Sequence, residues 1–266
     1  MEYNSDESKV EKYKFSDRLM FAIIMRDPNL CKQFIERVFP NRRVRKINVL
    51  STEETIITGL QSKSVRLDVM FEGDNKVYDI EMQVARENAL YKRARYYQSA
   101  MAIHSLKAGE DYDKLKDTYV IFVCQFDPIR KGEPIYRLNT YEENLGLKIP
   151  DGCNTILLNT KCPLEKVPRE LRPLFEYIES GKAEQDGFVL QIDEKVREAE
   201  FNEEVKRIMT VEQELKIQYR IGRENGQEET QIAIAKKLMD KDMPIEQVAE
   251  VTGLTIEEIE GLSEDC

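Results

Sequence analysis

The sequence predicts an α/β or α+β fold with a mixed sheet, because helical and strand-like segments alternate along its first half. Apolar residues recur at helical spacing near the N-terminus, and short β-branched runs follow them. A second helical stretch, residues 87–107, precedes the nearly all-apolar run "TYVIFVCQF" (118–126), which is typical of a strand buried on both faces. The order helix, strands, helix, buried strand favours one mixed sheet covered by helices.

The N-terminal helices and the strands after them have identifiable boundaries. Ser16 is the expected N-cap of the first helix, and Pro28 starts a second helix that runs through Val38. Four strand-like runs follow: "KINVL", "ETIIT", "SVRLDVMF" and "KVYDIEMQV". The turn sequence "EGDN" joins the last two runs and suits a hairpin. We therefore expect a meander of three or four strands.

The second half of the chain predicts one more strand and then mostly helix. "NTILLNT" (154–160) reads as a strand, "PLFEYIESG" as a helix, and the chain is charged and helical in pattern from Asp193 onward. Gly222 and Gly226 interrupt this pattern and predict a hinge before the C-terminal segment. We expect a main domain at residues 1–190 and a helical tail at 191–266.

The end of the tail, "PIEQVAEVTGLTIEEIEGL", has the form of a helix-turn-helix. The second helix of such a motif reads DNA through Arg, Lys, Asn or Gln side chains at its exposed positions. Here those positions carry Glu257, Glu258 and Glu260, which repel phosphate. The tail is a degenerate helix-turn-helix, and a structural or protein-contact role is favoured over base reading.

The composition indicates the cellular compartment of the protein and the kind of metal it could bind. No uncharged apolar run is long enough to span a membrane, and the five cysteines show no CxxC spacing, which favours a soluble protein of the reducing cytoplasm. His104 is the single histidine, so a multi-histidine zinc site cannot form within the chain. Any metal would be held mainly by carboxylates, which favours Mg²⁺ or Mn²⁺.

The net charge of −10 argues against a uniformly basic surface for nucleic acid, but two local segments are basic. One is residues 91–97, "YKRARYY". The other is residues 37–49, which carry five basic residues and no acid: Arg37, Arg42, Arg43, Arg45 and Lys46. Within it, Arg42, Arg43, Arg45 and Lys46 could follow phosphates, although an ordinary solvated loop explains them equally well.

The stretch "RLDVMFEGDNKVYDIEMQ" (66–83) contains the candidate catalytic residues. Asp79, Glu81 and Gln83 alternate along a strand and therefore share one face. If the two strands pair as a hairpin, Asp68 comes within a few ångströms of Glu81, and two carboxylates so close require a proton or a cation between them. An ordinary solvated hairpin face shows the same alternation. Asp79 could be a further metal ligand, but a solvated acid at the strand end is favoured.

This stretch, followed by "LYKRARYYQSAM" and "GEDYDKLKDTYVIFVCQFDPI", resembles the PD-(D/E)XK nuclease family transposases, which are recombination-promoting nucleases of bacteria. The resemblance runs from about Phe15 to the 180s. It implies a restriction-endonuclease-like αβββαβ core, here with a C-terminal helical extension. The tail pattern also resembles that of many members.

The resemblance assigns roles to particular residues. It implies Mg²⁺ or Mn²⁺ on Asp68, Glu81 and the main-chain carbonyl of Met82, with Gln83 in the position where the wider superfamily has lysine. An acid on the first helix often assists, and Asp17 is the candidate. The DNA contacts expected on the helix after the strands are Lys92, Arg93, Arg95 and Gln98. Tyr97, by its helical spacing, is expected in the core.

The function implied is a metal-dependent DNA endonuclease that hydrolyses phosphodiester bonds in recombination or transposition. The alternative is a catalytically silent relative that binds DNA or protein and acts as a regulator. Asp68, Glu81 and Gln83 favour the first. Cutting both strands with one site per chain would suggest a homodimer.

Overall fold

The chain divides into two compact units, residues 1–202 and 203–266. The computed structural model describes residues 13–45, 47–52, 55–56, 65–66, 68–86, 89–239, 243–256 and 259. The division between the units falls after α5 (Gly187–Phe201), so this helix lies wholly in the first unit. The expected boundary at residues 190 and 191 lies inside that helix.

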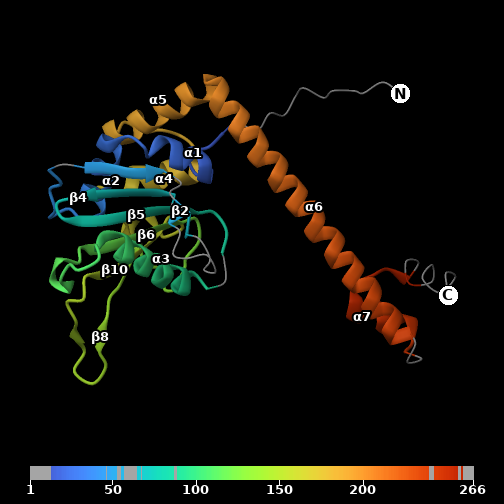
Figure 1. The fold of residues 1–266 in the computed structure, drawn as a ribbon. Helices are drawn as coiled ribbons and strands as arrows, with labels where there is room; N and C mark the ends of the chain where they lie inside the picture. Colours follow the sequence, from blue (N-terminus) through green and yellow to red (C-terminus); the bar gives the residue numbers. More distant parts are fainter. Residues whose placement is uncertain are drawn as a thin grey trace. The chain divides into compact units, whose positions relative to one another are not determined.

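A six-stranded mixed sheet forms the core of the first unit (Figure 1). Its spatial order is β1 (Ile47–Thr52), β4 (Val69–Gly73), β5 (Lys76–Gln83), β6 (Asp117–Cys124), β10 (Cys153–Asn159) and β7 (Ile135–Leu138). The β5, β6 and β10 strands are parallel, whereas the other neighbours pair antiparallel. β6 lies inside the sheet and is buried from Thr118 to Cys124, which confirms the expected central strand.

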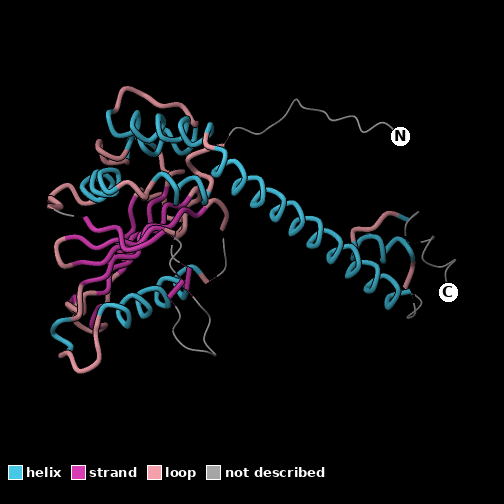
Figure 2. Tube along the Cα trace, turned by 45° about the horizontal axis from the view of Figure 1, so that its top comes forward, coloured by secondary structure: helices cyan, strands magenta, loops and turns pink. Residues whose placement is uncertain are grey.

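Helices cover both faces of this sheet (Figures 1 and 2). One face carries α1 (Arg18–Ile24), α2 (Pro28–Val38), α4 (Arg172–Ser180) and α5, and the other carries α3 (Leu90–Ser105). The succession α2, β1, β4, β5, α3, β6 is the αβββαβ order that the resemblance implies. The described elements also include two-stranded ribbons, β2 (Thr55–Ile56) with β3 (Val65–Arg66) and β8 (Tyr141–Glu142) with β9 (Leu147–Lys148), and 3₁₀ turns at Tyr112–Lys114 and Leu164–Lys166.

The helix starts follow capping rules with one difference from expectation. α2 begins at Pro28, and the Asp27 carboxylate accepts hydrogen bonds from the backbone N–H groups of Asn29 and Leu30 at 2.8 and 3.3 Å. The N-cap of α1 is Asp17 and not Ser16, so that prediction was wrong. Ser16 is instead buried.

The β4–β5 hairpin turns tightly at Asp74 and Asn75. Both residues have positive φ, 50° and 59°. Two-residue hairpin turns need this left-handed backbone at both positions, and Asp and Asn tolerate it better than other non-glycine residues. Gly73 pairs with Lys76 across the turn, and the register continues to Val69 opposite Ile80. The predicted hairpin is confirmed, and its register is fixed from the turn outward.

The second unit contains the long helix α6 (Glu203–Met239) and the short helix α7 (Ile245–Thr252). α6 continues through both Gly222 and Gly226, so the expected hinge was wrong. A glycine inside a helix costs only about 1 kcal/mol, which the rest of a long helix can offset. Ala235 of α6 packs with Val248 and Ile259 in a small buried cluster. Gly253 caps the C-terminus of α7, and its φ of 75° suits glycine. Glu257, Glu258 and Glu260, in the predicted second helix of the helix-turn-helix, lie outside the described residues.

Two expectations on cysteines and membrane spans can be checked over the described ranges. None of the helices found there is both long and apolar enough to span a membrane. Each of the four cysteines placed by the structure is a free thiol, and Cys153 is the exposed one.

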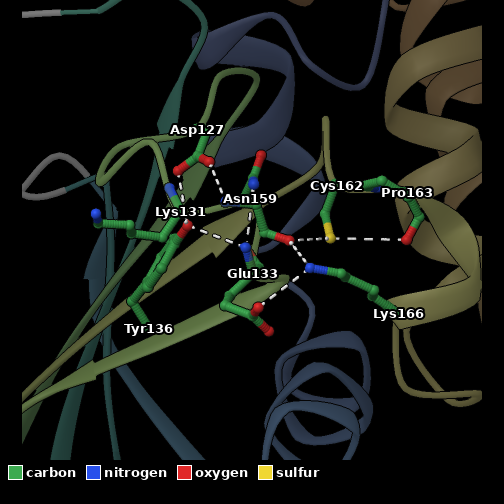
Figure 3. Close-up of polar contacts among 9 residues, drawn as sticks. Asp127, Lys131, Glu133, Tyr136, Asn159, Cys162, Pro163 and Lys166 are labelled. Carbon is green, nitrogen blue, oxygen red and sulfur yellow. Dashed lines mark hydrogen bonds and ion pairs between the residues drawn. The ribbon is translucent and has the colours of Figure 1, made fainter.

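An aspartate organises the loop between β6 and β7 (Figure 3). The Asp127 carboxylate accepts hydrogen bonds from the backbone N–H groups of Ile129, Arg130 and Gly132 and from the Tyr136 hydroxyl, at 2.7–3.1 Å. Burial by itself raises the pKa of Asp127, but these bonds to the charged form outweigh it and the pKa is lowered. The loop is thereby tied to the first residues of β7.

Replacing Asp127 with alanine removes these acceptors, and we expect the free energy of unfolding to fall by about 1–3 kcal/mol. Because the folded-state pKa is lowered, the contribution of Asp127 is present above the ordinary carboxyl pKa of about 4 and is lost as the pH falls through the folded-state value. Urea unfolding at neutral and acidic pH measures both effects. The control is Asp113→Ala at an exposed position, expected to change stability by under about 0.5 kcal/mol. Equal stability of the two variants at neutral pH would contradict this account.

Candidate active site

Three acidic side chains lie buried close together on the sheet. Asp68 and Glu81 are each 2% exposed, and Asp79 is fully buried. The pairing of Val69 with Ile80 brings Asp68 opposite Glu81, and the Asp68 backbone N–H donates a hydrogen bond to Oε1 of Glu81 at 3.1 Å. The expected approach of these two residues across the hairpin is therefore found. Asp79, Glu81 and Gln83 share the face of β5 that α3 covers.

Two arginines from different helices form ion pairs with two of these acids. Nε of Arg18, the first residue of α1, lies 2.8 Å from Oδ1 of Asp68. Arg93 of α3 donates from Nη2 to Oε2 of Glu81 at 3.2 Å and from Nη1 to Oε1 of Gln83 at 3.0 Å. The Arg93 guanidinium also reaches the hydroxyl of the partly buried Tyr97 at 3.2 Å. Arginines near the N-termini of α1 and α3 thus contact acids of the same hairpin.

Arg18 was not among the site residues predicted from the sequence. It pairs with a residue 50 positions away, and no local spacing marks such a contact. Its one signal in the sequence is its place next to Asp17, the acid expected to assist on the first helix. Asp17 itself accepts a hydrogen bond from the Lys14 backbone N–H at 2.8 Å, and among the described residues it makes no hydrogen bond to the acids of β5.

The electrostatic state of the acids reflects burial and mutual repulsion. Burial raises the pKa of Asp68, although the charge of Arg18 opposes the shift. Burial, followed by the charge of Asp68, raises the pKa of Glu81 to about 8. Burial and the charges of Glu81 and Asp68 raise the pKa of Asp79 well above its usual range. The two arginines do not offset the effects of burial and mutual repulsion, so the site favours protons or a further cation on these acids.

Asp79 is not the solvated strand-end acid that was expected. It lies inside β5, where Met70 and Val120 are its neighbours on the adjacent strands. Neither of its carboxyl oxygens has a hydrogen-bond partner. The expectation was wrong because the alternating strand pattern cannot show that α3 covers the polar face.

The oxygen atoms present fit a hard divalent cation. Oδ2 of Asp68 is buried without a hydrogen-bond partner, so an acceptor is available there. The Met82 carbonyl, between Glu81 and Gln83 in the chain, accepts a hydrogen bond from Nε2 of Gln83 at 3.1 Å. Within the described ranges no three His, Cys, Asp or Glu side chains are grouped to share a metal. The fitting set is therefore two carboxylates and a backbone carbonyl, all oxygen donors as Mg²⁺ and Mn²⁺ prefer.

The remaining predicted contacts on α3 divide into exposed and buried ones. Lys92 and Arg95 are exposed in the first turns of the helix. Gln98 is 6% exposed, its amide nitrogen donates to the Asn154 carbonyl at 2.7 Å, and its oxygen accepts from the Thr118 hydroxyl. The structure thus places Gln98 between α3 and the sheet, where its amide is engaged by protein. His104 is exposed near the end of the helix.

Comparison with known proteins gives one match. A family model described as PD-(D/E)XK nuclease family transposase matches residues 12–161. This range includes α1, the acidic hairpin, α3 and β6, and the match confirms the resemblance stated from the sequence. Neither the curated proteins nor the solved structures gave a match.

Replacing Arg18 with glutamine leaves the buried Asp68 carboxylate without its ion-pair partner. In metal-free buffer with EDTA we expect the free energy of unfolding to fall by about 1–3 kcal/mol, the usual effect of leaving a buried polar group unpaired. The double variant Arg18→Gln/Asp68→Asn should recover part of this loss, because the charge that Arg18 compensated is gone. Urea unfolding of wild type, both single variants and the double variant gives the coupling. Strictly additive effects would show that the pair is not energetically coupled.

Proposed function

Because this chain belongs to the PD-(D/E)XK nuclease family transposases, we propose that it is a metal-dependent DNA endonuclease that acts in recombination or transposition. The observation that carries this proposal is the contact of Asp68 with Glu81 across the hairpin, with Gln83 on the same strand face. Buried acids with raised pKa values, unpartnered carboxyl oxygens and nearby arginines are typical of catalytic sites and atypical of a solvated hairpin.

The carboxylates of Asp68 and Glu81 and the Met82 carbonyl would hold Mg²⁺ or Mn²⁺. Such an ion, when bound, lowers the pKa of a coordinated water and stabilises negative charge on a phosphate undergoing displacement. Gln83 has an amide that donates and accepts hydrogen bonds but does not take up a proton near neutral pH. We therefore assign Gln83 the orientation of the attacking water and not the role of general base.

Arg93 would act at the boundary between the acids and the DNA. Its guanidinium contacts Glu81, Gln83 and Tyr97, and its side chain is still 26% exposed. It orients the acids and offers positive charge where a phosphate would approach. The exposed Lys92 and Arg95 flank it in sequence and would contact the DNA backbone without reading bases. Gln98 and Asp17 remain weaker candidates, since their described contacts are to the protein itself.

We further propose that the protein works in the cytoplasm, and that two copies act together when both strands of a duplex are cut. Each chain offers one cluster of the described acids, and one such site cuts one strand at a time.

The first test is nicking of supercoiled plasmid by purified protein with Mg²⁺ or Mn²⁺ and with EDTA. We expect cleavage in either metal, none in EDTA, and a loss of at least about 100-fold in Asp68→Asn and Glu81→Gln, because each removes a charged metal donor. Circular dichroism and DNA binding establish that the variants are folded. Wild-type protein that binds DNA as the variants do, and never cleaves, would favour the catalytically silent alternative.

The second test concerns the backbone contacts of α3. Lys92→Gln/Arg95→Gln in the Glu81→Gln background should weaken duplex binding and reduce the slope of log affinity against log salt by about 2, close to 0.9 for each lost phosphate contact. Fluorescence anisotropy over a salt series measures this slope. Lys107→Gln, an exposed position beyond the end of α3, is the matched control and should leave it unchanged. An equal change in the control would indicate a general charge effect.

A further inference from the structure

A second polar pocket lies away from the acidic site. It encloses about 420 Å³ between the end of α2, the strands β6, β7 and β10, and Lys148 of β9. Its lining includes Phe39, Arg42, Tyr119, Arg137, Asn139 and Lys148. Three of them are cationic, and no acidic residue lines the pocket. This volume is in the range of small-molecule sites, about 300–1,000 Å³.

The pocket is on the other face of the sheet from the acids. Tyr78 and Tyr119 pair across β5 and β6, and the hydroxyls of both accept hydrogen bonds from Arg42, whereas Glu81 pairs with Phe122. Because strand residues alternate between faces, Tyr78 and Glu81 point in opposite directions, and they lie about 10 Å apart along the strand. The two sites are therefore separate.

The guanidinium of Arg42 is held rigidly. It donates to the hydroxyls of Tyr78 and Tyr119, each at 2.9 Å. Its central carbon lies 4.5 Å from the ring centre of Phe39 and 4.6 Å from that of Tyr119. The two neighbouring rings and the two hydroxyl acceptors leave this cation few alternative positions, which reduces the entropy lost when it binds a ligand.

A second guanidinium stands beside the first. Arg137 packs over the same Phe39 ring at 5.2 Å and donates to the Val38 carbonyl at 3.2 Å. Burial and the charge of Arg42 lower the pKa of Arg137, so the two cations repel each other. Over the described ranges, Arg42, Arg137 and Lys148 form no ion pair with a carboxylate. Cations that lie close together without an anionic partner are typical of an anion-binding site.

We propose that this pocket binds a phosphate group through Arg42, Arg137 and Lys148. Paired guanidiniums present planar forks of N–H donors that match phosphate oxygens, and a lysine adds a mobile point charge. The Asn139 amide, oriented by Asn154 at 3.0 Å, provides a neutral polar neighbour. The phosphate could belong to a small molecule or to a DNA backbone that crosses this face. The inference does not depend on the proposed nuclease activity.

The test uses the full-length protein in EDTA, with pyrophosphate as the probe and calorimetry as the readout. We expect binding by wild type and a loss of affinity of about tenfold or more in Arg137→Gln and in Lys148→Gln, as for one charge-assisted hydrogen bond. Arg42 is left intact because its contacts with two tyrosines also support the fold. Thermal unfolding without pyrophosphate shows whether each variant is folded.

Two control variants locate the binding. Arg43→Gln removes an arginine that is next in sequence and 80% exposed, and Arg93→Gln removes the arginine of the acidic site. Both should bind pyrophosphate as wild type does. Absence of binding by wild type at millimolar pyrophosphate, or equal binding by the Arg137 and Lys148 variants, overturns the proposal. A loss of binding in the Arg93 variant alone also overturns it.

A short DNA duplex distinguishes the two sources of phosphate. If the duplex displaces pyrophosphate and the Arg137 and Lys148 variants bind the duplex less well, the pocket takes a backbone phosphate. If pyrophosphate binds and the duplex does not displace it, the pocket takes a small phosphorylated molecule. Either result supports the phosphate site and shows which class of ligand it binds.

Discussion

The register of the β4–β5 hairpin is the constraint on which the acidic site depends. Asp74 and Asn75 set the turn, and the pairing that follows places Asp68 opposite Glu81. A shift of one residue would move every side chain of a strand to the other face. Glu81 and Gln83 would then lie among the residues under α1 and α2, while Tyr78 and Ile80 would face α3. A local backbone conformation at the turn thus determines which chemistry the sheet presents.

The buried acids of the candidate active site depart from ordinary core packing. A core of this size normally excludes unpaired carboxyl groups, because burying a polar group without partners is unfavourable. Here one face of β5 carries Asp79, Glu81 and Gln83 between apolar neighbours. Arg93 contacts Glu81 and Gln83, while Arg18 pairs with Asp68 on the other arm of the hairpin. The arrangement leaves the Asp79 oxygens and Oδ2 of Asp68 buried without hydrogen-bond partners. Such conflict between stability and site chemistry is expected where function constrains the sequence.

The strand and helix order could be predicted because it rests on local patterns: the alternation along β5, the apolar run of β6 and the turn between β4 and β5. Local patterns failed where tertiary contacts decide. Gly222 and Gly226 look like a break, yet α6 continues through them. Asp79 looks solvated, yet α3 covers it. Arg18 and the phosphate pocket bring together residues from distant segments, and no spacing in a single sequence reports such contacts.

The origin of the two site arginines has a consequence for how the first unit opens. Arg18 comes from the helical layer on one face of the sheet, and Arg93 comes from the single helix on the other. If the layer that contains α1 detached, Asp68 would lose Arg18, and if α3 detached, Glu81 would lose Arg93. Because the two carboxylates are close together, the loss of either arginine also destabilises the ion pair that the other layer forms. The polar centre therefore couples the two layers, and we expect them to exchange amide hydrogens as one cooperative unit rather than as independent pieces.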